Sequence, residues 1–260
     1  MNKLRQQGLA YSTIKKAYDA LNACLKFAVA NHIIPYNPMQ TVVTPSKKHF
    51  KIKKIEILND IEIETLYKEA ANKISRYDYV IILMLYTGVR SSEVLALKWN
   101  DYNAKDKILT IDGALVWVKN RDNNENGIKY KLLEQDTAKT KKSIRKIYLG
   151  TKAMTALNEF YNQNYRGNDD DYIICTENYT PLFARNLQRA FDGILNRSNI
   201  THKGLHALRH SFASMLIRKG VDIKVVSELL GHSDVSFTYN QYIHIIDEQK
   251  NMAIQKLNEI

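Results

Sequence analysis

The chain has 260 residues, of which 45% are apolar and 25% are charged, so it can bury a sizeable core. Its two cysteines, Cys24 and Cys175, have no CxxC spacing, which excludes a disulfide framework and argues against a structural zinc site. The net charge of +11 and the pI of about 9.4 favour a polyanionic partner, nucleic acid first, over a merely basic soluble protein.

Charge and apolar residues are unevenly distributed along the chain. Residues 1–57 hold ten Lys or Arg against two Asp or Glu, so they carry +8 of the +11, and the other 203 residues carry +3. A positive N-terminal part joined to a near-neutral body predicts a DNA clamp attached to a catalytic domain. The longest apolar run, 79–86, has eight residues, whereas a membrane-spanning helix needs roughly 20, so we expect no membrane span.

Residues 12–30 are expected to form the first long helix, with Ser12 as its N-cap. One apolar stripe recurs at spacings of three and four, formed by Ile14, Tyr18, Leu21, Leu25 and Ala28. Pro35 and Pro38 prevent the helix from continuing. Because a single helix cannot bury its own stripe, we expect residues 1–43 to be part of a larger helical domain.

A basic linker is predicted at 44–56, where TPSKKHFKIKK shows no apolar periodicity. Such a segment is either a solvated hinge or a strap along DNA phosphates, and it can be both. The linker residues expected to contact DNA are Lys47, Lys48, Lys51, Lys53 and Lys54.

The remainder, 57–260, is predicted to be one α+β domain that is mainly helical, with one small antiparallel sheet. Asn59 or Asp60 caps its first helix, whose apolar residues are Ile61, Ile63, Leu66 and Ala70. Further helices are expected at 76–86, 91–98, 152–163, 183–196, 204–219, 222–230, 237–243 and from 246. Strands are expected at 107–111, 114–119, 128–132, 144–149 and 171–175, with a hairpin tip at 120–127. Gly220 and Gly231 end two of the helices.

The segment HALRH, residues 206–210, lies within one of these predicted helices. His206 and Arg209 are three residues apart and share a face, where Arg can grip two phosphate oxygens and His can move a proton. A surface Arg beside a partly buried His is the simpler interpretation. His206 and His210 also have the i, i+4 spacing of metal ligands, but no third ligand is evident, so we expect no metal.

The segment LLGHSDVSFTYNQYIH, residues 229–244, places His232 directly after the helix that ends at Gly231. A position near a helix C-terminus favours a protonated imidazole. Tyr242 follows ten residues later, with Tyr239 as the rival candidate for any chemistry. For an arbitrary Tyr near a helix end, the ordinary role is a core aromatic with its hydroxyl at the rim.

Two more segments carry candidate cations. YTGVRSSEVLALKW, residues 86–99, puts Arg90 between two helices, where it could simply pair with Glu93. AKTKKSIRKIYL, residues 138–149, puts Lys139 in a turn before a strand. Residues 119–146 hold nine Lys or Arg against four Asp or Glu, so Lys141 and Lys142 could belong to a basic edge that faces DNA.

Taken in order, TGVRSSEVLALKW, AKTKKSIRKIYL, HALRHSFAS and LLGHSDVSFTYNQYIH resemble the signature of the tyrosine recombinase (phage integrase) family. The likeness is to integrases of conjugative transposons and of phages of low-GC bacteria. It covers about residues 57–246 and is specific, because chance would not place all four segments in this order. It implies a site-specific recombinase that cuts and rejoins DNA through a 3′-phosphotyrosyl intermediate, for integration or excision of a mobile element, and without a cofactor.

The resemblance implies a role for each candidate residue. Arg90 and Arg209 would clamp the scissile phosphate, and His232 would hydrogen-bond one of its non-bridging oxygens. Tyr242 would be the nucleophile, since the family's pattern ends Tyr-x-His and this chain has Tyr242-Ile243-His244.

Three further residues have implied supporting roles. Lys139 would be the general acid for the leaving 5′-hydroxyl, His206 would assist proton transfer to and from the nucleophile, and Glu93 would orient the site. The implied partners are double-stranded DNA attachment sites and further copies of the chain in a tetramer, in which residues 246–260 would dock on a neighbouring subunit. An excisionase or a host DNA-bending protein would be the accessory partner, in a bacterial cytoplasm.

The N-terminal stretch LAYSTIKKAYDALNACLKFAVANHIIPYNP resembles the second half of the family's helical core-binding domain. We therefore expect either a truncated chain or a naturally short protein. Rival functions are a type IB topoisomerase-like activity, a non-catalytic DNA-binding protein and a phosphotransfer enzyme for small molecules. The complete set of six catalytic residues and the basic N-terminal part argue against the last two. The DNA target does not follow from any motif.

Overall fold

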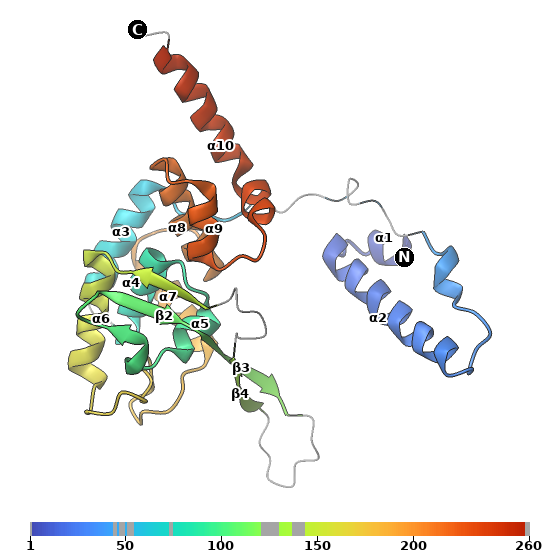
Figure 1. Ribbon diagram of the computed structural model, residues 1–260, viewed down its shortest axis with the longest axis horizontal. Helices are drawn as coiled ribbons and strands as arrows, with labels where there is room; N and C mark the ends of the chain where they lie inside the picture. Colours follow the sequence, from blue (N-terminus) through green and yellow to red (C-terminus); the bar gives the residue numbers. More distant parts are fainter. Residues whose placement is uncertain are drawn as a thin grey trace. The chain divides into compact units, whose positions relative to one another are not determined.

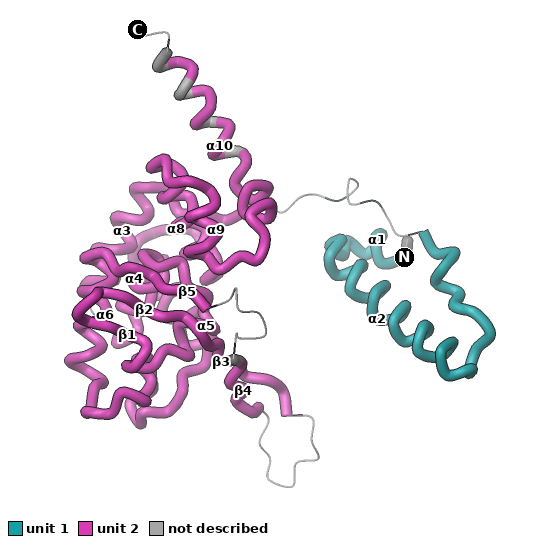
Figure 2. The backbone as a smooth tube through the Cα atoms, in the orientation of Figure 1, with its two compact units in different colours: residues 1–54 teal, residues 55–260 magenta. Residues whose placement is uncertain are grey.

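The computed structural model describes residues 2–43, 46, 50, 55–72, 75–120, 130–136 and 144–257. The chain forms two compact units, Met1–Lys54 and Ile55–Ile260, which Figure 2 distinguishes by colour. Several predicted DNA contacts and the predicted general acid lie outside the described residues, namely Lys47, Lys48, Lys51, Lys53, Lys54, Lys139, Lys141 and Lys142.

The first unit contains the helices α1 (Asn2–Gln6) and α2 (Tyr11–Ala30) and the short 3-10 helix Pro38–Thr41. The prediction of Ser12 as N-cap was wrong, because α2 begins one residue earlier and Ala10 stands at the cap without a side-chain hydrogen bond. From the stripe, Ile14 is buried and Leu21 is 51% exposed. The other members of the stripe, Tyr18, Leu25 and Ala28, are half-buried, so the helix is partly covered along its length.

The second unit begins with α3 (Asp60–Ala71), α4 (Asp78–Thr87) and α5 (Ser91–Ala96). Asn59 caps α3 as predicted, and its side chain accepts from the Glu62 N–H while Glu62 accepts from the Asn59 N–H. Ile63, Leu66 and Ala70 are buried, but Ile61 is exposed, since it lies on the opposite face of the helix.

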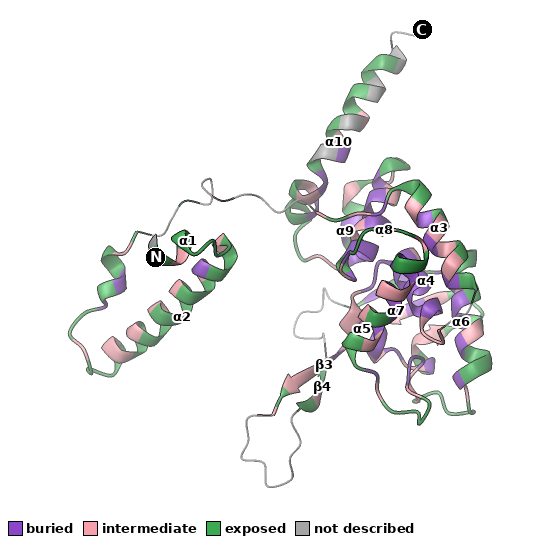
Figure 3. Cartoon of the chain, turned by 180° about the vertical axis from the view of Figure 1, so that it is seen from behind, coloured by how far each residue is buried: buried purple, intermediate pink, exposed green. Residues whose placement is uncertain are grey.

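Helix α4 is the centre of the second unit. It packs against α3, α6 (Thr151–Asn164), α7 (Ala184–Arg197) and α8 (His206–Arg218), and all seven residues from 79 to 85 are buried. A helix that is apolar all round needs such complete cover. Figure 3 shows buried residues concentrated in this part of the unit.

The predicted small antiparallel sheet forms as two separate pieces (Figure 1). One piece has the strand order β1-β2-β5, formed by Tyr102–Asn103, Ile108–Ile111 and Arg145–Tyr148. The other is the hairpin of β3 (Gly113–Lys119) and β4 (Tyr130–Asp136), paired antiparallel from Gly113↔Asp136 to Lys119↔Tyr130.

The strand predicted at 171–175 was wrong. This stretch makes isolated bridges, Lys98 with Tyr172 and Cys175 with Pro181, in place of a ladder. Its Ile173 N–H donates to the Leu97 carbonyl, so the apolar residues are buried by pairing with the turn after α5, where the 3-10 helix Trp99–Asp101 follows.

The C-terminal part contains α8, α9 (Ile223–Leu230) and α10 (Val235–Leu257). The two helices predicted at 237–243 and from 246 are one element, interrupted at Tyr242, whose φ of −115° and ψ of 17° are not helical. The end of α10 extends away from the rest of the unit in Figure 1, and Ile254 on it is 61% exposed. No helix within the described residues is long and apolar enough to cross a membrane.

Candidate active site

Two helices end at glycines, and the loops at their ends both contact Arg209. Gly88 ends α4 and Gly231 ends α9, each with φ of 67°, a left-handed conformation that suits glycine. A Cβ at position 88 would clash with the ring of Phe212, and one at 231 would come within 2.8 Å of Nη1 of Arg145. Both positions therefore favour glycine, because the loop at Gly88 packs closely on Phe212 of α8 and Gly231 lies against the Arg145 side chain.

Arg209 on α8 joins these two loops. Its Nη1 donates to the Gly88 carbonyl at 2.8 Å and its Nη2 donates to the Leu230 carbonyl at 2.5 Å. Because Gly88 lies two residues before Arg90, and Leu230 two residues before His232, one guanidinium fixes the segments that carry both. Within the described part of the chain, these bonds use two of its five N–H donors and leave three for a ligand.

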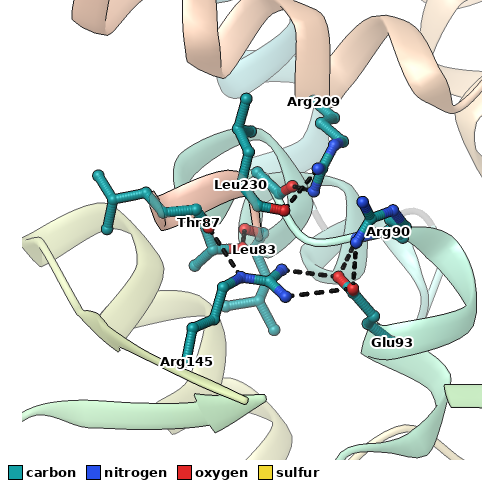
Figure 4. Close-up of polar contacts among 9 residues, drawn as sticks. Leu83, Thr87, Arg90, Glu93, Arg145, Arg209 and Leu230 are labelled. Carbon is teal, nitrogen blue, oxygen red and sulfur yellow. Dashed lines mark hydrogen bonds and ion pairs between the residues drawn. The ribbon is translucent and has the colours of Figure 1, made fainter. Parts of the chain in front are cut away.

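Glu93 is the acceptor at the centre of the cluster drawn in Figure 4. It is 3% exposed and receives both Nη groups of Arg145, at 3.2 and 2.7 Å, together with the backbone N–H of Arg90 at 2.8 Å and its Nη1 at 2.6 Å. Burial alone would raise the pKa of Glu93, but the hydrogen bonds and charges of Arg145 and Arg90 hold it at about 2. Glu93 is thus ionised and orients two arginines.

Arg145 was not identified as a functional residue from the sequence. It is buried, and its Nε donates to the Leu229 carbonyl at 2.8 Å, so it ties Glu93 to the end of α9. A signal was present: Arg145, Ile147 and Leu149 share one face by strand alternation, and the latter two are buried core residues. A cation on a core-facing strand position requires a buried acid as partner.

Tyr242 is 1% exposed, and its hydroxyl lies 2.8 Å from Nδ1 of His210. Burial raises the pKa of Tyr242 well above its ordinary value, although the charge of Arg209 acts in the opposite direction. The sequence drew attention to His210 only as a possible metal ligand. Its position four residues after His206 was the available signal that it faces the same side of α8.

His232 is partly buried, and its Nδ1 lies 2.7 Å from Oγ1 of Thr238. The expectation of a protonated imidazole at the end of α9 was wrong, because burial and the charges of Arg209, Arg90 and Arg145 lower its pKa to about 4. Its other ring nitrogen, Nε2, is therefore the proton donor of a neutral ring when Nδ1 accepts from the threonine hydroxyl.

Two further candidates from the sequence, His206 and Tyr239, are described by the structure. His206 is exposed at the start of α8, with its ring centroid 6.4 Å from that of His210. The rival Tyr239 is half-buried and lies beside Lys250. Among the residues that the structure describes, no group of three or more His, Cys, Asp or Glu could hold a metal ion.

The comparisons with known proteins agree with one another. The model of the phage integrase family matches residues 56–249. The chain belongs to this family. Its likeness extends to a tyrosine recombinase XerC-like protein of Caldanaerobacter subterraneus subsp. tengcongensis, 36% identical over all of this chain and 69% of the relative, and to tyrosine recombinase XerC of Bacillus subtilis, 29% identical over 94% and 73%.

A solved structure of the Tn1549 transposon integrase, in complex with a circular intermediate DNA, has the same fold. Its TM-score is 0.75 at 20% identity, over 98% of this chain and 82% of that one. The predicted family and the predicted mainly helical α+β class are confirmed. The protein is a tyrosine-type site-specific recombinase.

Proposed function

We propose that the cluster of Arg90, Arg145, Arg209 and His232 holds the scissile phosphate of DNA for attack by Tyr242. The observation that carries this proposal is the net positive charge of the cluster. Three guanidinium groups stand against the single carboxylate of Glu93, which leaves about +2 in a partly buried site whose histidine is neutral. Uncompensated buried charge is costly, so the site favours an anion.

The geometry suits a phosphodiester that gains negative charge during attack. Arg90 keeps 37% of its side chain exposed and can present its remaining donors, while Arg209 is held at two carbonyls with three N–H groups left over. Nε2 of His232 would donate to a non-bridging oxygen. Donors that are fixed before the reaction stabilise developing charge without reorganisation, and losing one typically costs about 10²–10³ in rate.

The proposed cleavage forms the bond between the Tyr242 oxygen and phosphorus and breaks the bond from phosphorus to the 5′-oxygen. The phenol loses its proton, and Lys139 supplies one to the leaving 5′-oxygen. The product is a 3′-phosphotyrosyl link that stores the bond energy, so a different 5′-hydroxyl can attack it and rejoin the strands without ATP. His206 would assist proton transfer to and from the nucleophile, and this role stays a prediction.

Double-stranded DNA attachment sites are the proposed substrate, with integration or excision of a mobile element as the natural role. The Tn1549 transposon integrase, a relative in fold, is bound to a circular intermediate DNA. In residues 1–54 the excess of Lys and Arg supports binding of the DNA backbone by the first unit, which resembles part of a core-binding domain. Exchange between two sites would take a tetramer, with the exposed end of α10 as its contact.

A suicide substrate tests the proposal. Nicked duplexes built from the ends of the mobile element that carries the gene should trap a covalent protein–DNA adduct on a denaturing gel. We expect the adduct with the unaltered protein and with Tyr239→Phe, and its loss with Tyr242→Phe. No adduct with any substrate that the protein binds would instead support a non-catalytic DNA-binding protein.

Strand exchange separates the recombinase from a topoisomerase-like enzyme that uses the same chemistry. Two duplexes with different labels should yield recombinant products in the presence of the full chain. Relaxation of supercoiled DNA with no recombinant product would overturn the recombination proposal but leave the cleavage chemistry intact.

A further inference from the structure

The sequence predicted His206 as the histidine that assists proton transfer at Tyr242, but the histidine in contact with the Tyr242 hydroxyl is His210. The hydroxyl of Tyr242 on α10 lies 2.8 Å from Nδ1 of His210 on α8, and the two rings meet edge to face with centroids 6.1 Å apart. The contact joins residues that are 32 positions apart, and both groups are largely shielded from water. It is therefore a tertiary contact built by the packing of α10 on α8.

Nδ1 of His210 accepts from the hydroxyl of Tyr242 in the tautomer that carries the ring hydrogen on Nε2. In that tautomer the phenolic proton points at the lone pair of Nδ1, which lies 2.8 Å from the hydroxyl oxygen. The side-chain amide of Gln241 lies against the same ring, with its nitrogen 3.2 Å from Nδ1 and 3.5 Å from Nε2. The proposed role of His210 requires this tautomer.

We propose that His210 is a further catalytic residue, whose Nδ1 takes the proton of Tyr242 during cleavage and returns it during rejoining. In the forward step the Tyr242 oxygen bonds to phosphorus, its proton passes to Nδ1, and the 5′-oxygen leaves with a proton from the general acid. In the reverse step the phenolic oxygen leaves phosphorus and recovers the proton from His210. The inference rests on the proposed function of Tyr242.

The electrostatics of the pair keep the proton on Tyr242 as long as no anion is bound. Burial, then the charges of His206 and Arg209, lower the pKa of His210 to about 4, so the ring is neutral but a weak base until a negative charge lies beside it. Burial raises the pKa of Tyr242, so its phenol does not ionise by itself. A proton acceptor in contact with it is therefore needed for attack.

The position of His210 in the chain couples proton transfer to phosphate binding. Arg209 precedes it on α8 and is fixed at the carbonyls of Gly88 and Leu230, so the proton acceptor and the proposed phosphate clamp stand on one rigid element. The imidazolium formed in the reaction would also lie near the negative charge of the phosphate, which stabilises it.

The first test compares His210→Asn with His210→Ala in single-turnover cleavage of the suicide substrate. Asn retains a hydrogen-bonding group near the position of Nδ1 but takes no proton. We expect both variants to cleave about 10²–10⁴-fold more slowly than the unaltered protein, the usual range for loss of a general base. DNA affinity and the unfolding midpoint of His210→Asn should stay close to those of the unaltered protein.

The second test changes the acidity of the nucleophile. Replacing Tyr242 by difluorotyrosine lowers the pKa of the phenol, so cleavage depends less on a base. We expect the penalty of His210→Asn to shrink at least tenfold in this background, which a purely structural role of His210 would not produce.

Three results would overturn the inference. Full activity of His210→Asn would reduce His210 to a positioning residue. Unchanged or faster cleavage by His210→Ala would show that cleavage does not need the contact between His210 and Tyr242. An undiminished penalty of His210→Asn with difluorotyrosine at position 242 would exclude proton transfer to His210. In each case the unaltered protein still forms its adduct. Absence of that adduct would instead be a failure of the proposed function of Tyr242.

Discussion

The two units of the chain use charge in different ways. Residues 1–54 hold ten Lys or Arg against one Asp, and none of the described cations among them is buried. In the second unit Glu93, Arg145 and Arg209 are all buried and hydrogen-bonded to one another or to backbone carbonyls. Mobile surface cations bind any phosphate backbone, whereas fixed ones hold a single phosphate in one geometry. The first unit should therefore set affinity, and the second should set rate.

Arg209→Lys should show most clearly that the second unit sets the cleavage rate and the first unit sets DNA affinity. Lys keeps the charge but cannot reach the Gly88 and Leu230 carbonyls and a phosphate at the same time. We expect cleavage to fall by at least about 10³-fold, beyond the loss of a single donor, while DNA affinity changes by less than tenfold. Quench-flow cleavage and fluorescence anisotropy measure the two quantities. A parallel fall in both would mean that binding and catalysis share their contacts.

Arg145→Met removes the buried partner of Glu93. Breaking a buried pair by removing one member typically costs about 3–5 kcal/mol, so we expect a loss of about 3 kcal/mol in the free energy of unfolding, measured in urea. Arg218→Met is the matched control, because its ion pair with Asp60 is exposed and 3.7 Å long, and exposed pairs contribute at most about 1 kcal/mol. Equal losses in the two variants would show that burial of Arg145 contributes nothing.

The lysines of the linker should act on affinity alone. Lys51, Lys53 and Lys54 changed to Gln should lower the salt dependence of DNA binding, by about 0.9 in the logarithmic slope for each phosphate that the protein no longer neutralises. At saturating DNA the cleavage rate should stay within twofold of the original. A slower rate at saturation would place the linker in the catalytic step.

Acid should lower the stability of the second unit in two successive pH ranges. The pKa of His210 and of His232 is lowered from 6.5 to about 4, so the folded state favours neutral rings, and stability is lost as the pH falls from about 6.5 towards 4. Glu93, with its pKa lowered from 4.5 to about 2, adds a further loss below about 4.5. Thermal unfolding of His210→Asn should show a weaker dependence in the first window only. An unchanged profile would mean that His210 is not buried as a neutral ring.

The sequence predicted most elements of the second unit because their signals are local. The Asn59 cap, the all-apolar helix α4 and the glycine at 231 each follow from a few neighbouring residues. The strand predicted at 171–175 failed because its pairing partner, the segment after α5, is distant in sequence and offers two hydrogen bonds in place of a ladder. The family signature supplied the candidate residues, which local patterns alone left ambiguous.

Contacts between distant segments could not be predicted. The burial of Tyr242 depends on how α10 packs on α8, and the neutral state of His232 depends on its burial and then on three arginines from three parts of the chain. Arg145 was part of a quoted motif but was interpreted as one more cation of a basic edge. Its pairing with Glu93 spans 52 residues and needs the sheet and α5 to be in place.

Mass spectrometry of the trapped adduct tests the central claim most directly. After digestion with nuclease and protease, the nucleotide should remain attached through its 3′-phosphate to the peptide that contains residue 242, with the fragment ions placing it on Tyr242. A nucleotide found on Tyr239, on any other side chain, or through a 5′-phosphate would contradict the account.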